Sequence, residues 1–185
     1  MSNKKKPSQS FKMREDHTWR CKPGYTIFVA DRGAVRFDFP KDWIIDPGPD
    51  AIKIIDKPAP DHTCSLSLSV FYLPVGIDWS DLPVDQLLRD ATSADTEHIL
   101  TRGDVHYERR PDLELAWRES RFMDPEEQRP AYSRSCTARA RNVQPLITLD
   151  YWPEDRDRLI PVWDEVMRTL RVGEYIKDPT RGPGY

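Results

Sequence analysis

The amino-acid sequence predicts an α+β fold with a mostly antiparallel β-sheet. The chain is largely a succession of probable strands, of which 35–39 and 64–70 alternate apolar and polar residues, as strands with one buried face do. Only two stretches have helical spacing, whereas a parallel sheet needs a helix at nearly every crossover. At ~100–200 residues per domain, the 185 residues fit one domain.

A β-hairpin is predicted at the start of the domain. The runs 25–30 and 34–39 are rich in β-branched and aromatic residues and flank the turn Asp31-Arg32-Gly33. The second run alternates strictly, so it presents an apolar face and a charged face. These faces carry Val35, Phe37 and Phe39 on one side and Arg36 and Asp38 on the other.

The middle of the chain predicts further strands and one helix. A short apolar run at 43–45 ends at the turn-forming residues 47–50, and 52–56 reads as another strand. The run 64–72 alternates most strictly, which directs Cys64, Leu66, Leu68 and Val70 toward the core. The segment 81–91 then changes to the spacing of an amphipathic helix.

The second half predicts four strands and a closing helix. The strands are expected around 105–108, 113–122, 131–141 and 146–152, with an exposed loop at 124–130. A single apolar stripe from Leu159 to Leu170 predicts the helix, and Gly173 is a suitable stop. Pro161 suits this helix only in or before its first turn, which leaves the helix start open. The expected domain is 19–173, between a flexible tail at 1–18 and a loose tail at 174–185.

Composition excludes several classes of function. Twenty-eight basic against 31 acidic residues give a net charge of −3, which does not favour nucleic acid. No stretch reaches the ~18 apolar residues of a membrane span, and the N-terminus lacks a secretory signal, so we expect a cytoplasmic protein. Three cysteines without a CxxC pair argue against a disulfide framework or zinc site. We expect no metal and no cofactor.

Three segments resemble the PsbP-like family, which includes the PsbP protein of photosystem II and a eukaryotic Ran-binding nuclear import factor. They are Phe37-Asp38-Phe39-Pro40-Lys41-Asp42-Trp43, the alternating strand 64–70, and the closing helix running into Thr169-Leu170-Arg171-Val172. The resemblance spans roughly 25–172 and identifies the chain as a bacterial relative. It implies a mostly antiparallel sheet flanked by helices in an α/β/α sandwich, and mostly non-catalytic binding roles.

His62 and Cys64 are the strongest candidates for chemistry. Two residues apart on a strand, they would share a face, where a thiolate and an imidazole form a nucleophilic pair or bind metal. A loop histidine beside a core cysteine is the simpler interpretation, because free cysteines are usually buried.

Arginines around the predicted strand 131–141 are the second candidates. Alternation places Arg139 and Arg141 on one face and Arg134 on the other, which gives a partial cationic patch able to meet an acidic partner. An ordinary solvated sheet face explains the same residues.

The leading hypothesis is a non-enzymatic binding or adaptor domain that holds a protein segment on a sheet face or in a cleft beside the helices. No Walker loop, GxSxG, HExxH or GxGxxG motif occurs in the sequence. Two alternatives stay open: a small-ligand-binding protein or enzyme that uses His62 and Cys64, and a chaperone for an apolar segment. The partner and the oligomeric state are not predicted.

Overall fold

The computed structural model describes residues 12–48, 51–79, 81–93 and 98–183. The strands are β1 (Tyr25–Ala30), β2 (Val35–Pro40), β3 (Ile44–Pro47), β4 (Ile52–Ile55), β5 (Cys64–Tyr72), β6 (Ile99–Arg102), β7 (His106–Arg110), β8 (Leu113–Met123), β9 (Pro130–Arg139), β10 (Val143–Tyr151) and β11 (Arg171–Val172). The helices are α1 (Val84–Ser93) and α2 (Arg156–Thr169), with 3₁₀ turns at Asp31–Gly33 and Pro153–Asp155.

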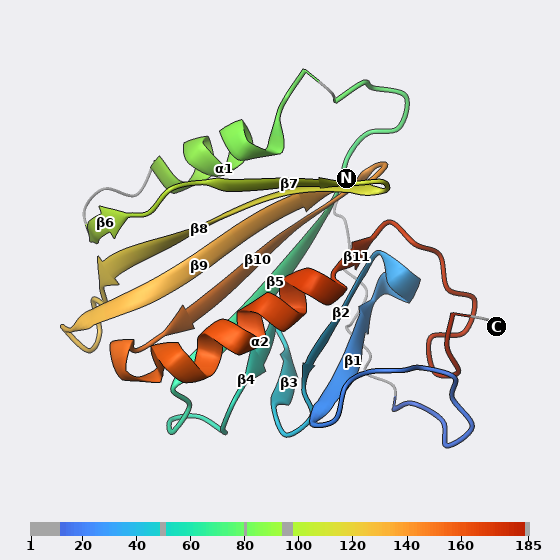
Figure 1. The fold of residues 1–185 in the computed structure, drawn as a ribbon, viewed down its shortest axis with the longest axis horizontal. Coiled ribbons are helices and arrows are strands. Elements are labelled where there is room, and N and C mark those ends of the chain that lie inside the picture. The colour runs from blue at the N-terminus through green and yellow to red at the C-terminus, as the bar shows by residue number, and fades with distance from the viewer. Residues whose placement is uncertain (1–11, 49–50, 80, 94–97, 184–185) are drawn as a thin grey trace, which may run out of the picture.

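The strands form two antiparallel sheets. The large sheet has the order β3-β4-β5-β10-β9-β8-β6, and β7 pairs with β8 as well. The small sheet has the order β1-β2-β11 and lies beside the large one near the end of α2 (Figure 1). Every strand pair is antiparallel, so the predicted fold class is confirmed.

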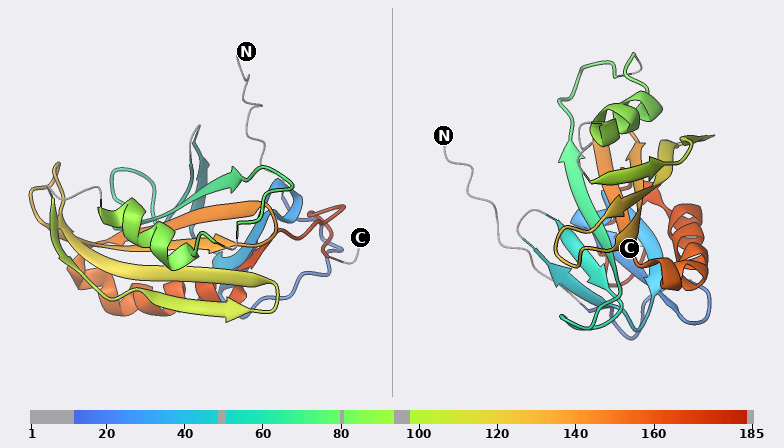
Figure 2. Two further views of the ribbon diagram at one scale, coloured as in Figure 1. Left: turned by 90° about the horizontal axis from the view of Figure 1, so that it is seen from above. Right: turned by 90° about the vertical axis from the view of Figure 1, so that its left-hand side faces the viewer.

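The two helices cover opposite faces of the large sheet, as Figure 2 shows from above. The core lies under α2, where Leu66 and Leu68 of β5 and Ile147 of β10 meet Trp163. The hairpin adds Phe37, which is fully buried. The period-2 and period-3.6 patterns therefore marked the buried faces correctly, because half-covered strands and helices must place their apolar side chains on one side.

Three features of the fold differ from the sequence prediction. The short strands β6 and β11 were not predicted, because each is too brief to show an alternating pattern. Pro161 lies inside α2 and not in its first turn, since the helix already begins at Arg156. Its ring is on the exposed side of the helix, where water can satisfy the carbonyl that loses its intrahelical partner.

The segments on either side of the predicted domain lie against each other. The backbone N–H of Arg14 donates to the carbonyl of Thr180 at 2.9 Å, and the indole N–H of Trp19 donates to the carbonyl of Pro179 at 2.8 Å. Ile176 is buried. The described parts of both expected tails thus form hydrogen bonds with each other, whereas residues 1–11 and 184–185 lie outside the described residues.

Candidate functional site

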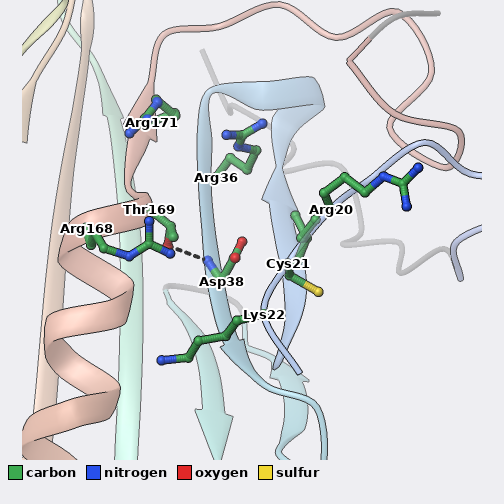
Figure 3. Close-up of a pocket in the computed structure, with 9 residues that line it drawn as sticks. Arg20, Cys21, Lys22, Arg36, Asp38, Arg168, Thr169 and Arg171 are labelled. Carbon is green, nitrogen blue, oxygen red and sulfur yellow. Dashed lines mark hydrogen bonds between the residues drawn. The ribbon is translucent and has the colours of Figure 1, made fainter. Parts of the chain in front are cut away.

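A cleft of about 320 Å³ opens between the small sheet and the end of α2 (Figure 3). We call it the cationic cleft. Its lining comes from four parts of the chain, and consists of Arg20, Cys21, Lys22, Ile27, Arg36, Asp38, Arg168, Thr169 and Arg171.

The small sheet and α2 hold this cleft together. Val35, Phe37 and Phe39 of β2 point into the core, so the alternation of the strand turns Arg36 and Asp38 toward the cleft. The backbone N–H of Asp38 donates to the Thr169 hydroxyl at 2.9 Å, and that hydroxyl donates to the carbonyl of Glu165 at 2.7 Å. The last turn of α2 is therefore fastened to β2.

The electrostatics of the cleft are strongly positive. Five cationic side chains line it against one carboxylate, Asp38. A second carboxylate, Glu165, lies behind the wall, where it accepts from Arg168 at 2.7 and 3.0 Å and pairs with Lys22 at 3.3 Å. Counting both carboxylates, the cleft holds an excess of three positive charges in a chain whose net charge is −3.

Two of these cations face each other across a strand pair. Arg36 of β2 stands directly opposite Arg171 of β11, and both line the cleft. Like charges directly opposite in an antiparallel pair destabilise a sheet. The guanidinium of Arg36 also lies 5.2 Å from the centroid of the Trp19 ring, which helps to hold it in place. An anion bound between the two arginines would relieve their repulsion.

Asp38 is the one acidic side chain in the lining, and its environment opposes its charge. Burial and the nearby charge of Glu165 raise the pKa of Asp38, although Arg36, Arg168 and Lys22 act in the opposite direction. The carboxylate therefore takes up a proton more readily than an ordinary aspartate, which makes the cleft more positive as the pH falls.

The structure places His62 and Cys64 in different environments. Cys64 is buried at the start of β5, and His62 is exposed in the preceding loop. Burial and the charge of Asp56 raise the pKa of the Cys64 thiol to about 12, despite the opposing effect of Arg158. A protonated, buried thiol is a poor nucleophile and a poor metal ligand, so this pair receives no support as a reactive site.

Cysteine labelling provides a test of this environment. We expect iodoacetamide to modify only Cys21 in the folded protein, because Cys64 and Cys136 are buried with thiol pKa values raised to about 12. Labelling of Cys21 should accelerate with rising pH, since partial burial and the charges of Asp38 and Glu165 raise its pKa. Mass spectrometry of the protein labelled with and without urea measures which cysteines react. Labelling of Cys64 as fast as Cys21 in the absence of urea would contradict the prediction.

Arg139 and Arg141 do not share one exposed face. Arg139 is buried and forms an ion pair with Glu114 of β8. Arg141 is exposed in the turn between β9 and β10, where its guanidinium donates to the carbonyl of Gly173 at 3.3 Å. The turn ends the alternation, so Arg141 follows the bend of the chain and not the face of β9.

The described part of the chain contains neither a metal-binding cluster nor a membrane-spanning helix. No group of three or more histidine, cysteine, aspartate or glutamate side chains is placed to hold a metal ion among these residues. No helix within the same residues is long and apolar enough to cross a membrane.

Comparison with known proteins places the chain in a family. The model of the Alr1449 family matches residues 26–176, which include the small sheet, the large sheet and α2. The chain belongs to the Alr1449 family. A similar protein of Nostoc sp. (strain PCC 7120), the uncharacterised protein alr1449, is 39% identical over 175 residues, which cover 94% of this chain and 91% of that protein.

Solved structures confirm the fold of this Alr1449 family member. The cyanobacterial PsbP protein (CyanoP) of Synechocystis sp. PCC 6803 superposes with a TM-score of 0.62 at 12% identity, over 84% of this chain and 99% of CyanoP. The Ran-binding protein Mog1p of Saccharomyces cerevisiae superposes with a TM-score of 0.53 at 8% identity, over 80% of this chain and 95% of Mog1p. The predicted resemblance to PsbP-like proteins is therefore confirmed at the level of the fold.

The cationic cleft was not predicted from the sequence. Arg36 and Asp38 were expected on the polar face of a strand, and Arg171 was considered only as part of the segment that follows the closing helix. What brings them together is the pairing of β2 with β11, two strands far apart in the chain. The available signal was a strand with a charged face together with basic residues at the end of a helix, and both features are common on ordinary surfaces.

Proposed function

We propose that this member of the Alr1449 family is a non-enzymatic binding domain that holds an acidic segment of a partner protein in the cationic cleft. The observation that carries the proposal is the opposed pair Arg36 and Arg171 within an excess of positive charge. Arginine forks match carboxylates with two parallel hydrogen bonds, so an extended acidic segment could satisfy several of these side chains at once.

Other features of the cleft support binding over catalysis. Cys21 is the one thiol in the lining, and its pKa is raised, which opposes nucleophilic chemistry. The cleft is lined mostly by charged side chains, unlike the mostly apolar pockets that enclose small substrates. Mog1p, which has the same fold, is itself described as a Ran-binding protein, so this fold can serve protein binding.

A peptide titration tests the proposal. A fluorescein-labelled peptide rich in glutamate is titrated with the protein and followed by fluorescence anisotropy, with the same peptide carrying glutamine as the matched control. We expect binding of the acidic peptide alone, weakening as salt rises. Equal binding of both peptides, or of neither, would contradict the proposal. Inorganic phosphate displacing the peptide at low concentration would instead indicate a small-anion site.

The charge of Asp38 should limit the affinity of the cleft. Asp38→Asn removes the one carboxylate of the lining, so we expect the acidic peptide to bind about three- to tenfold more tightly at neutral pH. Because the pKa of Asp38 is raised, the wild-type affinity should approach that of the variant as the pH falls through this pKa. Asp112→Asn, an exposed change in the turn before β8, serves as the control. An unchanged affinity would show that Asp38 does not face the ligand.

The chaperone hypothesis receives weaker support. Exposed apolar side chains gather at the end of β5 and in the loop after it, at Phe71, Tyr72, Val75 and Ile77. Phe71 and Tyr72 belong to the end of β5 and Val75 and Ile77 to the loop after it, and none of the four lines the cationic cleft. The cytoplasmic location expected from the sequence remains a prediction.

A further inference from the structure

A second groove lies on the other side of the last turns of α2. Its volume is about 300 Å³, and it is bounded by β7, β8 and α2. Trp117, Trp163 and Met167 supply its apolar wall, and Glu108, Arg110, Asp164 and Arg168 supply its charged rim. We call it the tryptophan groove.

The rim of this groove is balanced in charge. Arg110 donates to both carboxylate oxygens of Glu108, at 2.7 and 3.0 Å, and Arg168 is held by Glu165. With two arginines and two carboxylates in the rim, the groove lacks the positive excess of the cationic cleft. The rings of Trp117 and Trp163 meet edge to face with centroids 6.0 Å apart, which fixes the shape of the wall. The chemistry of the groove therefore suits an apolar group.

The wall also contains an unpaired hydrogen-bond donor. Trp163 is 1% exposed, and its indole Nε1 has no hydrogen-bond partner among the residues that the structure describes. An indole N–H can only donate, and leaving it buried without an acceptor has a free-energy cost. Met167 lines the same groove, and its unbranched side chain can change rotamer readily. A carbonyl oxygen that reached Nε1 after such a shift would satisfy the donor.

Arg168 connects the two sites, because it lines both the cationic cleft and the tryptophan groove. We infer that the tryptophan groove binds one apolar side chain of the same partner segment whose carboxylates occupy the cationic cleft, with a main-chain carbonyl of that segment accepting from Trp163. The inference rests on the proposed function. It defines the partner as an acidic segment that contains a large aliphatic or aromatic residue beside its carboxylates.

The test is a series of labelled acidic peptides of equal length in which a single leucine occupies each interior position in turn. With leucine at one position, or at either of two adjacent positions, we expect the peptide to bind about tenfold more tightly than the leucine-free acidic peptide. Burial of one aliphatic side chain provides a gain of this size. Binding at those positions should also change the tryptophan fluorescence of the protein.

Two variants identify where the leucine binds. Trp163→Phe removes the indole N–H, and Asp164→Trp places a ring at the groove from an exposed rim position, with loss of the 4.0 Å ion pair between Asp164 and Arg134. Asp164→Trp should abolish the gain from leucine and Trp163→Phe should reduce it, and both should leave the affinity for the leucine-free acidic peptide within about twofold. Asp157→Trp, on an exposed position in the first turn of α2, is the matched control and should keep the gain. Circular dichroism confirms that each variant is folded.

The outcomes separate the two proposals. If the acidic peptide binds but no leucine position increases its affinity, the groove inference is wrong and the proposed function stands. If the acidic peptide fails to bind, a peptide of glutamine with one leucine tests the tryptophan groove by itself. Binding of this peptide that is lost in Asp164→Trp supports an apolar site alone. If this peptide also fails to bind, both the proposed function and the groove inference are wrong. A leucine gain that survives Asp164→Trp places the leucine elsewhere and also overturns the inference.

Discussion

Glu119→Ala is expected to lower the free energy of unfolding by about 3–5 kcal/mol, a large fraction of the stability of a domain this size. Glu119 of β8 accepts hydrogen bonds from Arg134 at 2.8 Å, from the Tyr151 hydroxyl at 2.7 Å and from Arg156 at 3.2 Å. These partners come from β9, β10 and α2. Alanine would remove the nearer carboxylate of the buried Arg134 and leave it only the exposed Asp164 at 4.0 Å, and breaking a buried ion pair on one side costs more than the pair contributes.

The same network predicts a pH dependence. Burial alone would raise the pKa of Glu119, but the hydrogen bonds from Arg134, Tyr151 and Arg156 and the charge of Arg134 outweigh it and hold the pKa below its usual range. A lowered pKa in the folded state stabilises the protein above the ordinary glutamate pKa, and this contribution disappears as the pH falls through the lowered value. The difference between the wild type and Glu119→Ala should therefore shrink in acid.

Urea unfolding at several pH values measures both effects. Glu126→Ala, an exposed change in the loop between β8 and β9, is the control and should alter stability by less than ~0.5 kcal/mol. If Glu119→Ala were as mild as this control, the network would not be what fastens α2 to the sheet.

The second large effect concerns the opposed arginines of the cationic cleft. Arg36→Glu combined with Arg171→Glu should weaken binding of the acidic peptide about 100-fold, because two attractive charges become repulsive. Arg109→Glu combined with Arg121→Glu makes the same change in net charge at two exposed positions of β7 and β8. This control should keep the affinity within about threefold. Equal losses in both variants would show that only net charge matters.

The single variant Arg171→Glu separates binding from stability. It places a glutamate opposite Arg36, so a repulsive cross-strand pair becomes an attractive one. We expect the protein to become more stable by about 0.2–1 kcal/mol while its affinity for the acidic peptide falls about tenfold. Thermal unfolding and anisotropy on the same sample measure the two changes. A loss of both stability and affinity would instead assign Arg171 a structural role.

Periodicity predicted most of the fold because the core of this protein is regular. The alternation of 64–72 and the apolar stripe of 159–170 each reflect one buried face, so both elements were found with bounds close to β5 and α2. The two-residue strand β11 could not be found in this way, since its pairing with β2 depends on the assembled core. The opposition of Arg36 and Arg171 follows from that pairing and was invisible for the same reason.

The candidate residues chosen from the sequence show a related limit. His62 and Cys64 were selected because their residue types can perform chemistry, and the structure buries the thiol. Arg139 was selected for its charge, which is already paired with Glu114 inside the molecule. Residue type alone does not reveal whether a charge is paired, whereas burial and ion partners do. The cationic cleft stands out because its cations outnumber the carboxylates near them.

Affinity capture from the native cells tests the central claim most directly. The tagged wild type, the Arg36→Glu/Arg171→Glu variant and the Arg109→Glu/Arg121→Glu control are used as parallel baits, and mass spectrometry quantifies the retained proteins. We predict a partner that the wild type and the control retain equally and that the cleft variant loses. A synthetic acidic segment of that partner should bind the wild type and should not bind the cleft variant. The same set of proteins on all three baits, with no acidic segment that binds the cleft, would contradict the account.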